Sequence, residues 1–166
     1  TRPGWSVNER VVLSTFSFHK EAMFRDLREN ASVIAGHPLV QVLAVGPDAP
    51  SAGRYDFDVP PAEQLDEEVP PEDLRTILDA DSTQRRCVLA AQRGHSFVMD
   101  GPPGTGKSQT IANMIAALIS DGKSVLFVSE KAAALDVVRN RLAVAGLDEF
   151  VLELHSHQAT RKHVAQ

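Results

Sequence analysis

The chain has 166 residues, of which 43% are hydrophobic, with one cysteine and a formal net charge of −5. This composition allows a buried core in one domain with an appended segment. A single cysteine excludes an intrachain disulfide and favours a reducing, cytoplasmic setting. No stretch reaches the ~18 apolar residues that a membrane span needs, so we expect no membrane contact.

The charge is divided unevenly along the chain. Residues 1–80 carry −7, whereas residues 81–166 carry +2. The acidic half would repel nucleic acid, and the mildly basic half would tolerate it. A charge of +2 is by itself typical of an ordinary solvated surface.

Two segments are predicted before residue 81. Residues 1–47 are expected to be mainly helical, because Met23 and Leu27 are spaced to share one face of a helix. Residues 48–80 are rich in proline and acidic side chains. We expect them to form an extended linker on the surface, with no part in a core.

Residues 81–166 are predicted to alternate between helices and apolar strands. The expected strands are SFVMD, VLFV and FVLELH, and the helices between them present these apolar positions: Ile111, Met114, Ile115, Leu118, Leu135, Val138 and Leu142. A βαβαβ order predicts a parallel sheet with helices on its faces. The expected fold class is therefore α/β with an incomplete parallel sheet, preceded by the helical segment and the acidic linker.

The sequence GPPGTGKS at residues 101–108 has the pattern G-x-x-x-x-G-K-[ST], which is typical of a phosphate-binding loop. Glycine permits a backbone whose N–H groups converge on phosphate oxygens, as does the N-terminus of the next helix. Lys107 can reach the β- and γ-phosphates, and the Ser108 hydroxyl can bind Mg²⁺. We take these two as candidate catalytic residues. The expected nucleotide contacts in this stretch are Gly101, Pro102, Pro103, Gly104, Thr105, Gly106, Lys107, Ser108 and Gln109.

The stretch GPPGTGKSQTIANMIAALI resembles motif I of superfamily 1 helicases, which are P-loop motors with RecA-like domains. The preceding DSTQRRCVLAA resembles the segment in which that family places an adenine-reading glutamine. The resemblance implies a RecA-like fold, ATP and Mg²⁺ as cofactors, and Gln84 as an adenine contact. An amide can pair with both a donor and an acceptor of adenine. Gln84 can equally be an exposed polar residue in the first turn of a helix.

The stretch VLFVSEKAAALDVV resembles motif Ia of the same family, whose loop touches single-stranded nucleic acid. The resemblance implies contacts from Ser129, Glu130 and Lys131, with DNA expected more than RNA. Lys131 can equally be an ordinary residue of a helix's first turn. WSVNERVVLSTFSFHKEAMFRDLREN is similar to segments of large bacterial helicase-related proteins. The resemblance thus covers nearly the whole chain and is most specific at residues 81–135.

Hydrolysis of ATP also needs a second acidic ligand for Mg²⁺, a residue that orients water, and an arginine. In helicases an Asp-Glu pair at the end of a buried strand supplies the first two. Asp148 and Glu149 follow Gly146 in helical surroundings, so we exclude this pair. We therefore expect part of a larger ATPase, with the remainder of a helicase core as its partner. Such a chain would bind nucleotide but hydrolyse it poorly alone.

Three other functions remain open. An AAA-type ATPase also uses GPPGTGK, although threonine is usual where Ser108 stands. A small-molecule kinase is disfavoured by the 80 residues before the loop, and a nucleotide-sensing interaction module would need no catalysis. Other kinds of site are not supported. His155 and His157 would point to opposite faces of a strand, Cys87 fits a buried helix face, and Ser156 has no nucleophile elbow.

Overall fold

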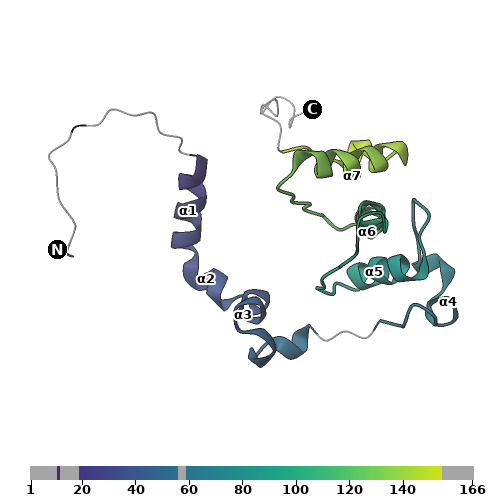
Figure 1. The fold of residues 1–166 in the computed structure, drawn as a ribbon, viewed down its shortest axis with the longest axis horizontal. Helices are drawn as coiled ribbons and strands as arrows, with labels where there is room; N and C mark the ends of the chain where they lie inside the picture. The colour runs from purple at the N-terminus through teal and green to yellow at the C-terminus, as the bar shows by residue number, and fades with distance from the viewer. Residues whose placement is uncertain (1–10, 12–18, 56–58, 155–166) are drawn as a thin grey trace. The chain divides into compact units, whose positions relative to one another are not determined.

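The computed structural model describes residues 11, 19–55 and 59–154, and the chain divides into two compact units, Thr1–Gly53 and Arg54–Gln166 (Figure 1). Each unit is described by itself. The finer division into segments 1–47, 48–80 and 81–166 stays a prediction. Within the described ranges, every helix is too short or too polar to cross a bilayer.

The first unit is a series of short helices over the described residues 19–53. Its elements are α1 (His19–Glu29), α2 (Ala31–Gly36), α3 (Pro38–Val45) and the 3₁₀ turn η1 (Gly46–Asp48), with η2 (Ala52–Arg54) crossing the unit boundary. Pro38 occupies the first turn of α3, where its missing N–H is tolerated, and the His37 side chain accepts a hydrogen bond from Leu39 N at 3.2 Å. Met23 and Leu27 are 65% and 56% exposed, so their shared face is not buried within this unit.

The second unit is built around helix α6. Its elements are α4 (Leu65–Glu68), η3 (Pro71–Asp73), α5 (Ser82–Gln92), α6 (Lys107–Ser120), α7 (Ala132–Val144) and η4 (Asp148–Phe150). Helix α6 contacts both α5 and α7 and lies between them (Figure 1). Consequently α6 is buried on two sides. Small residues permit the close approach: Ala112, Ala116 and Ala117 are buried together with Ile115.

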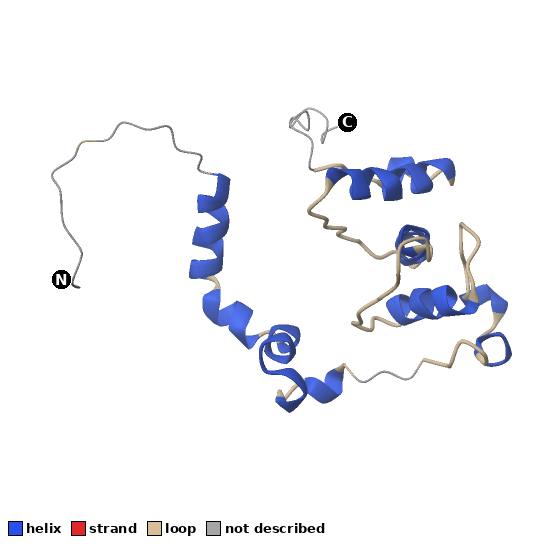
Figure 2. Cartoon of the chain, viewed as in Figure 1, coloured by secondary structure: helices blue, strands red, loops and turns tan. Residues whose placement is uncertain are grey.

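The predicted parallel sheet is wrong for the residues that the structure describes. Figure 2 shows helices and loops in these ranges and no strand. The expected strands at residues 96–100 and 125–128 lie in loops. Of the third, residues 150–155, Phe150 belongs to the turn η4 (Asp148–Phe150), residues 151–154 lie in a loop, and His155 lies outside the described residues. Phe97 and Phe127 pack against the helices, whereas Val98 and Leu126 are 91% and 80% exposed. An apolar run predicts a tendency to be buried, but a strand also requires a neighbouring backbone in register, which one segment's pattern does not specify.

The helix faces were predicted in part. On α7, Val138 and Leu142 are buried as expected, and Gly146 follows the helix with a φ of 77°. On α6, only Ile115 of the four expected apolar positions is fully buried. The single-face prediction missed that α6 packs against two neighbouring helices.

The acidic segment also contributes to a core, contrary to the expected surface linker. Val59, Leu65 and Val69 are buried in a cluster with Leu89 of α5. Arg86 of α5 donates hydrogen bonds to the Val59 and Pro60 carbonyl oxygens at 3.3 and 2.9 Å. Acidic side chains between these apolar residues remain exposed. The segment therefore has a buried side and a solvated side, which its overall composition concealed.

Replacing Leu65 with alanine should lower the free energy of unfolding by about 2–5 kcal/mol, because a fully buried leucine leaves a cavity. Urea denaturation measures this change. Leu126→Ala is the matched control in the same unit, and we expect it to change stability by less than about 0.5 kcal/mol because Leu126 is exposed. Equal losses in the two variants would contradict the burial of the acidic segment.

Candidate phosphate-binding site

The glycine-rich loop leads directly into helix α6. Gly106 is the N-cap of α6 with a φ of 78°, and Gly104 has a φ of 89°. Both values lie in the left-handed region that glycine tolerates best. Lys107 is the first residue of α6, and Ser108 follows in the same turn. The loop thus has the backbone that its glycines predicted, and the free N–H groups of the helix N-terminus lie at its end.

A tight turn shapes the beginning of the loop. The Thr105 N–H and hydroxyl both donate to the Pro102 carbonyl oxygen, at 3.4 and 2.9 Å. Proline at the second position and a positive-φ glycine at the third are the signature of a type II turn. A Cβ atom on Gly101 would lie 2.7 Å from the Thr105 hydroxyl, so the turn requires glycine there.

The Lys107 ammonium folds back over this turn. It donates to the carbonyl oxygens of Gly101 and Pro102, the latter at 2.8 Å. Phosphate oxygens carry more negative charge than carbonyl oxygens and would compete for the same N–H donors. The ammonium of Lys107 is therefore held at the loop, where the oxygens of an incoming phosphate can replace the two carbonyl oxygens as its acceptors.

Gln84 lies against the loop, although it comes 17 residues before Gly101 in the sequence. Its N–H donates to the Asp81 carboxylate at 2.8 Å and its side-chain oxygen accepts from Asp81 N at 3.3 Å, which forms a capping box at the start of α5. Its side-chain nitrogen donates to the Thr105 carbonyl oxygen at 3.0 Å. Both ends of the amide thus have partners within the protein. Adenine recognition by Gln84 stays a prediction.

Three polar side chains of α6 hold the backbone around the loop. The Thr110 hydroxyl donates to the Gly106 carbonyl oxygen at 3.1 Å, and the Gln109 amide donates to the Asp79 carbonyl oxygen. Asn113 is fully buried and bonds the backbone of Ile77 and Leu78. Asn113 was not among the residues predicted from the sequence. The signal was available, since an amide within a buried helix face needs partners.

The residues predicted to touch nucleic acid lie where α7 begins. Lys131 is the N-cap of α7, and its N–H donates to the Ser129 hydroxyl oxygen at 3.3 Å. Glu130 and Lys131 are exposed, and Ser129 is half-buried. Nucleic-acid contact by these three residues stays a prediction.

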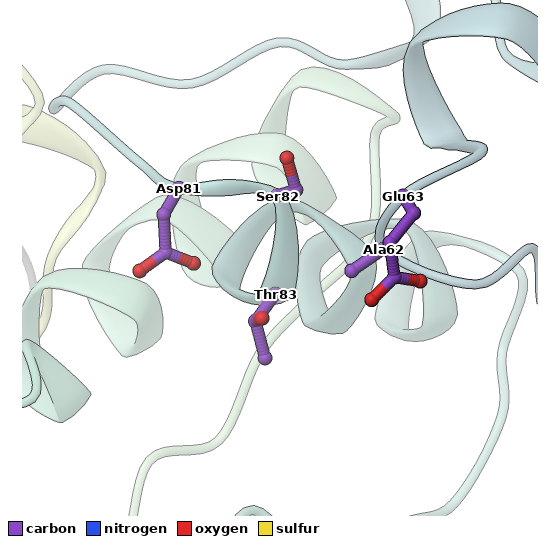
Figure 3. Close-up of a pocket in the computed structure, with 5 residues that line it drawn as sticks. All are labelled: Ala62, Glu63, Asp81, Ser82 and Thr83. Carbon is purple, nitrogen blue, oxygen red and sulfur yellow. The ribbon is translucent and has the colours of Figure 1, made fainter.

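A surface pocket of about 300 Å³ opens beside the start of α5. It is lined by Ala62, Glu63, Asp81, Ser82 and Thr83, whose side chains Figure 3 shows around the first turn of the helix. The two carboxylates would repel a phosphate chain. Their oxygens and the two hydroxyls can accept hydrogen bonds, so the lining suits a neutral or donor-rich group better than an anion.

Two observations concern acidic and metal-binding side chains. Asp148 and Glu149 lie exposed in the short turn η4, after α7, so no strand delivers them to a buried site. In the part of the chain that the structure describes, no group of three His, Cys, Asp or Glu side chains is placed to hold a metal ion.

Cys87 lies on α5 and is half-buried, not fully buried as expected. Burial raises the pKa of its thiol; the charge of Arg86 lowers that pKa, and Asp81 raises it. A raised pKa reduces the thiolate fraction at neutral pH, so Cys87 is a poor nucleophile. This agrees with a packing role for the residue.

Comparison with known proteins places the loop in a family. Residues 79–162, just over half of the chain, match the family model described as an AAA domain. The chain belongs to this family. The match to the AAA domain begins at Asp79, the residue held by Gln109, and includes Gln84, the loop and α7.

Two relatives of this AAA domain are described as uncharacterised ATP-dependent helicases. One, from Mycoplasma genitalium, is 53% identical over 62 residues, which are 37% of this chain and 6% of that protein. The other, its homologue in Mycoplasma pneumoniae, is 62% identical over 45 residues, or 27% of this chain and 4% of that protein. These matches confirm the resemblance to helicase-related P-loop proteins. The chain matches only a small part of each relative's length, and no solved structure matched.

The two positive-φ glycines of the glycine-rich loop, Gly104 and Gly106, form a matched pair for a test. Replacing either with alanine should cost about 1–2 kcal/mol of backbone strain. Gly106→Ala should cost about 1 kcal/mol more, because its Cβ would lie 2.5 Å from the Gln84 side-chain nitrogen and displace it from Thr105, whereas nothing lies within 4 Å at Gly104. Urea denaturation measures both losses. The extra loss should disappear in a Gln84→Ala background; an unchanged difference there would contradict the contact.

Proposed function

We propose that the chain is the ATP-binding part of a superfamily 1 motor that acts on single-stranded nucleic acid. The observation that carries this proposal is the loop itself, in which two positive-φ glycines lead into α6 and Lys107 is the first residue of the helix. This arrangement presents backbone N–H groups and an ammonium to one anion. The helicase names of the two relatives support a motor over a kinase.

Each loop residue has a proposed role in binding ATP. The N–H groups from Gly104 onward would bind the α- and β-phosphates, and Lys107 would leave the loop carbonyls for the β- and γ-phosphates. Ser108 would give Mg²⁺ one hydroxyl ligand, and Mg²⁺ would neutralise charge between the phosphates. Gln84 would exchange its internal partners for the adenine edge.

Binding and hydrolysis are expected to separate in this chain. The proposed residues bind and orient the triphosphate, but they include no second acidic ligand for Mg²⁺ and no residue that orients water. We propose that the rest of a helicase core supplies these groups together with an arginine. The chain alone would then hold ATP far longer than it takes an intact motor to hydrolyse it.

Lys107→Ala should weaken binding of a fluorescent ATP analogue in Mg²⁺ buffer by at least tenfold, because a charge-assisted contact is worth about 1.5–3 kcal/mol. Lys123→Ala is the matched control after the C-terminus of α6, where Lys123 donates to the Gln92 carbonyl oxygen at 2.6 Å, and it should leave affinity unchanged. ATP turnover by the unaltered chain should stay well below ~1 s⁻¹. Turnover near that of intact helicases, lost in Lys107→Ala, would overturn the separation of binding from hydrolysis.

Binding of single-stranded DNA separates this proposal from an AAA-type ATPase, the alternative that the family description favours. Affinity for a labelled oligonucleotide should fall steeply with salt, and Lys131→Ala should reduce the slope of log K against log salt by about 0.7. Lys123→Ala again serves as the control. An RNA oligonucleotide of the same sequence tests the expected preference for DNA. Absence of DNA binding at low salt, in a chain that binds ATP, would favour the AAA-type reading.

A further inference from the structure

A series of hydrogen bonds connects α6 to the segment before α5, and the start of α5 to the phosphate loop. Asn113 and Gln109 of α6 bond the backbone of residues 77–79. That segment leads to Asp81, which caps α5 by bonding Gln84 in both directions. Gln84 then donates to the Thr105 carbonyl oxygen, next to the N-cap of α6. The loop is therefore connected to α6 twice, once along the chain and once through residues 77–84.

Asn113 bonds both ends of its buried amide to the backbone of residues 77 and 78. Its side-chain oxygen accepts from Ile77 N at 3.0 Å and from Leu78 N at 2.9 Å, while its side-chain nitrogen donates to the Leu78 carbonyl oxygen at 3.1 Å. The residue is 0% exposed. A buried amide stripped of its partners costs about 1–3 kcal/mol, so this segment cannot leave α6 without a penalty.

Gln109 adds a second attachment one turn closer to the loop. Its amide donates to the Asp79 carbonyl oxygen, two residues before the cap residue Asp81. Helix α6 rises about 1.5 Å per residue, so Asn113 lies about 9 Å along the axis from Lys107. Asn113 thus acts at a distance from the phosphates that we expect to bind, whereas Gln109 is only two residues from Lys107 and stays an expected nucleotide contact. Both amides can act on Gln84 through the placement of residues 77–81.

We propose that Asn113 and Gln109 are positioning residues that hold residues 77–79 to α6 and thereby set Gln84 against the phosphate loop. In this arrangement the two amides fix where the cap of α5 forms, and the cap fixes which way the Gln84 side chain points. Where Gln84 reads the base of a nucleotide, which rests on the proposed function, the same two residues set the preference for adenine. Neither amide needs to touch the ligand.

Hydrogen exchange on the unliganded full chain tests the positioning role without any nucleotide. Gln109→Ala, at a partly exposed helix position that alanine suits, should accelerate exchange in residues 77–84 and also in residues 101–106, each several-fold. Asn113→Leu, which keeps the number and branching of the side-chain heavy atoms, should do the same more strongly. Val138→Ala, a buried change outside the series of hydrogen bonds, is the control for a general loss of stability. Faster exchange confined to residues 77–79 would overturn the proposal.

Nucleotide binding tests the consequence for base preference. We expect the ratio of Kd for GTP to Kd for ATP to fall up to tenfold in Gln84→Ala, in Gln109→Ala and in Asn113→Leu, but not in Val138→Ala. Combining Gln84→Ala with Gln109→Ala should add little, because both act on one contact. An unchanged ratio in Gln109→Ala, in a chain whose ratio depends on Gln84, would overturn the positioning role. A chain that binds neither nucleotide would refute the proposed function, while the exchange experiment would still decide the positioning role.

Discussion

The buried amide of Asn113 constrains how the second unit is put together. A side chain with two hydrogen-bonding ends, wholly removed from water, has to find partners of both kinds, and the backbone at residues 77 and 78 supplies them. That requirement places the segment before α5 along α6. In the positioning role that we propose, this placement sets the approach of Gln84 to the loop through the cap at Asp81.

Local backbone chemistry determines the shape of the phosphate loop, and long-range contacts determine what surrounds it. Its glycines allow the positive φ angles, and the Thr105 contacts close its turn, so its shape is mostly local. Its surroundings come from distant parts of the sequence, through Gln84 and through the attachment of residues 77–79. In the function that we propose, binding of phosphate would depend on the first contribution, and discrimination between bases would depend on the second.

Local features of the fold and site were predicted well from the sequence. Features that depend on a second, distant segment of the chain were not. The loop conformation and the start of α6 follow from the glycines of the loop, and both are observed. The parallel sheet was wrong because the apolar runs around Val98 and Leu126 specify no neighbouring backbone. The burial of Leu65 was missed because its neighbours are acidic, although the apolar positions among them share one side. Asn113 was missed because a polar residue in a helical pattern does not reveal which distant backbone groups it will bond.

Two prolines at the start of the loop restrict its backbone conformations independently of its hydrogen bonds. Pro102 and Pro103 have fixed φ angles, and the turn that follows them is already closed by Thr105. A chain segment with fewer accessible conformations loses less entropy when a ligand orders it. The same prolines carry no N–H and so contribute no donor to a bound phosphate. The first residues of the loop therefore restrict its backbone, and Lys107 at its end carries the positive charge. A restricted loop with one charge favours tight binding of a small anion by few groups.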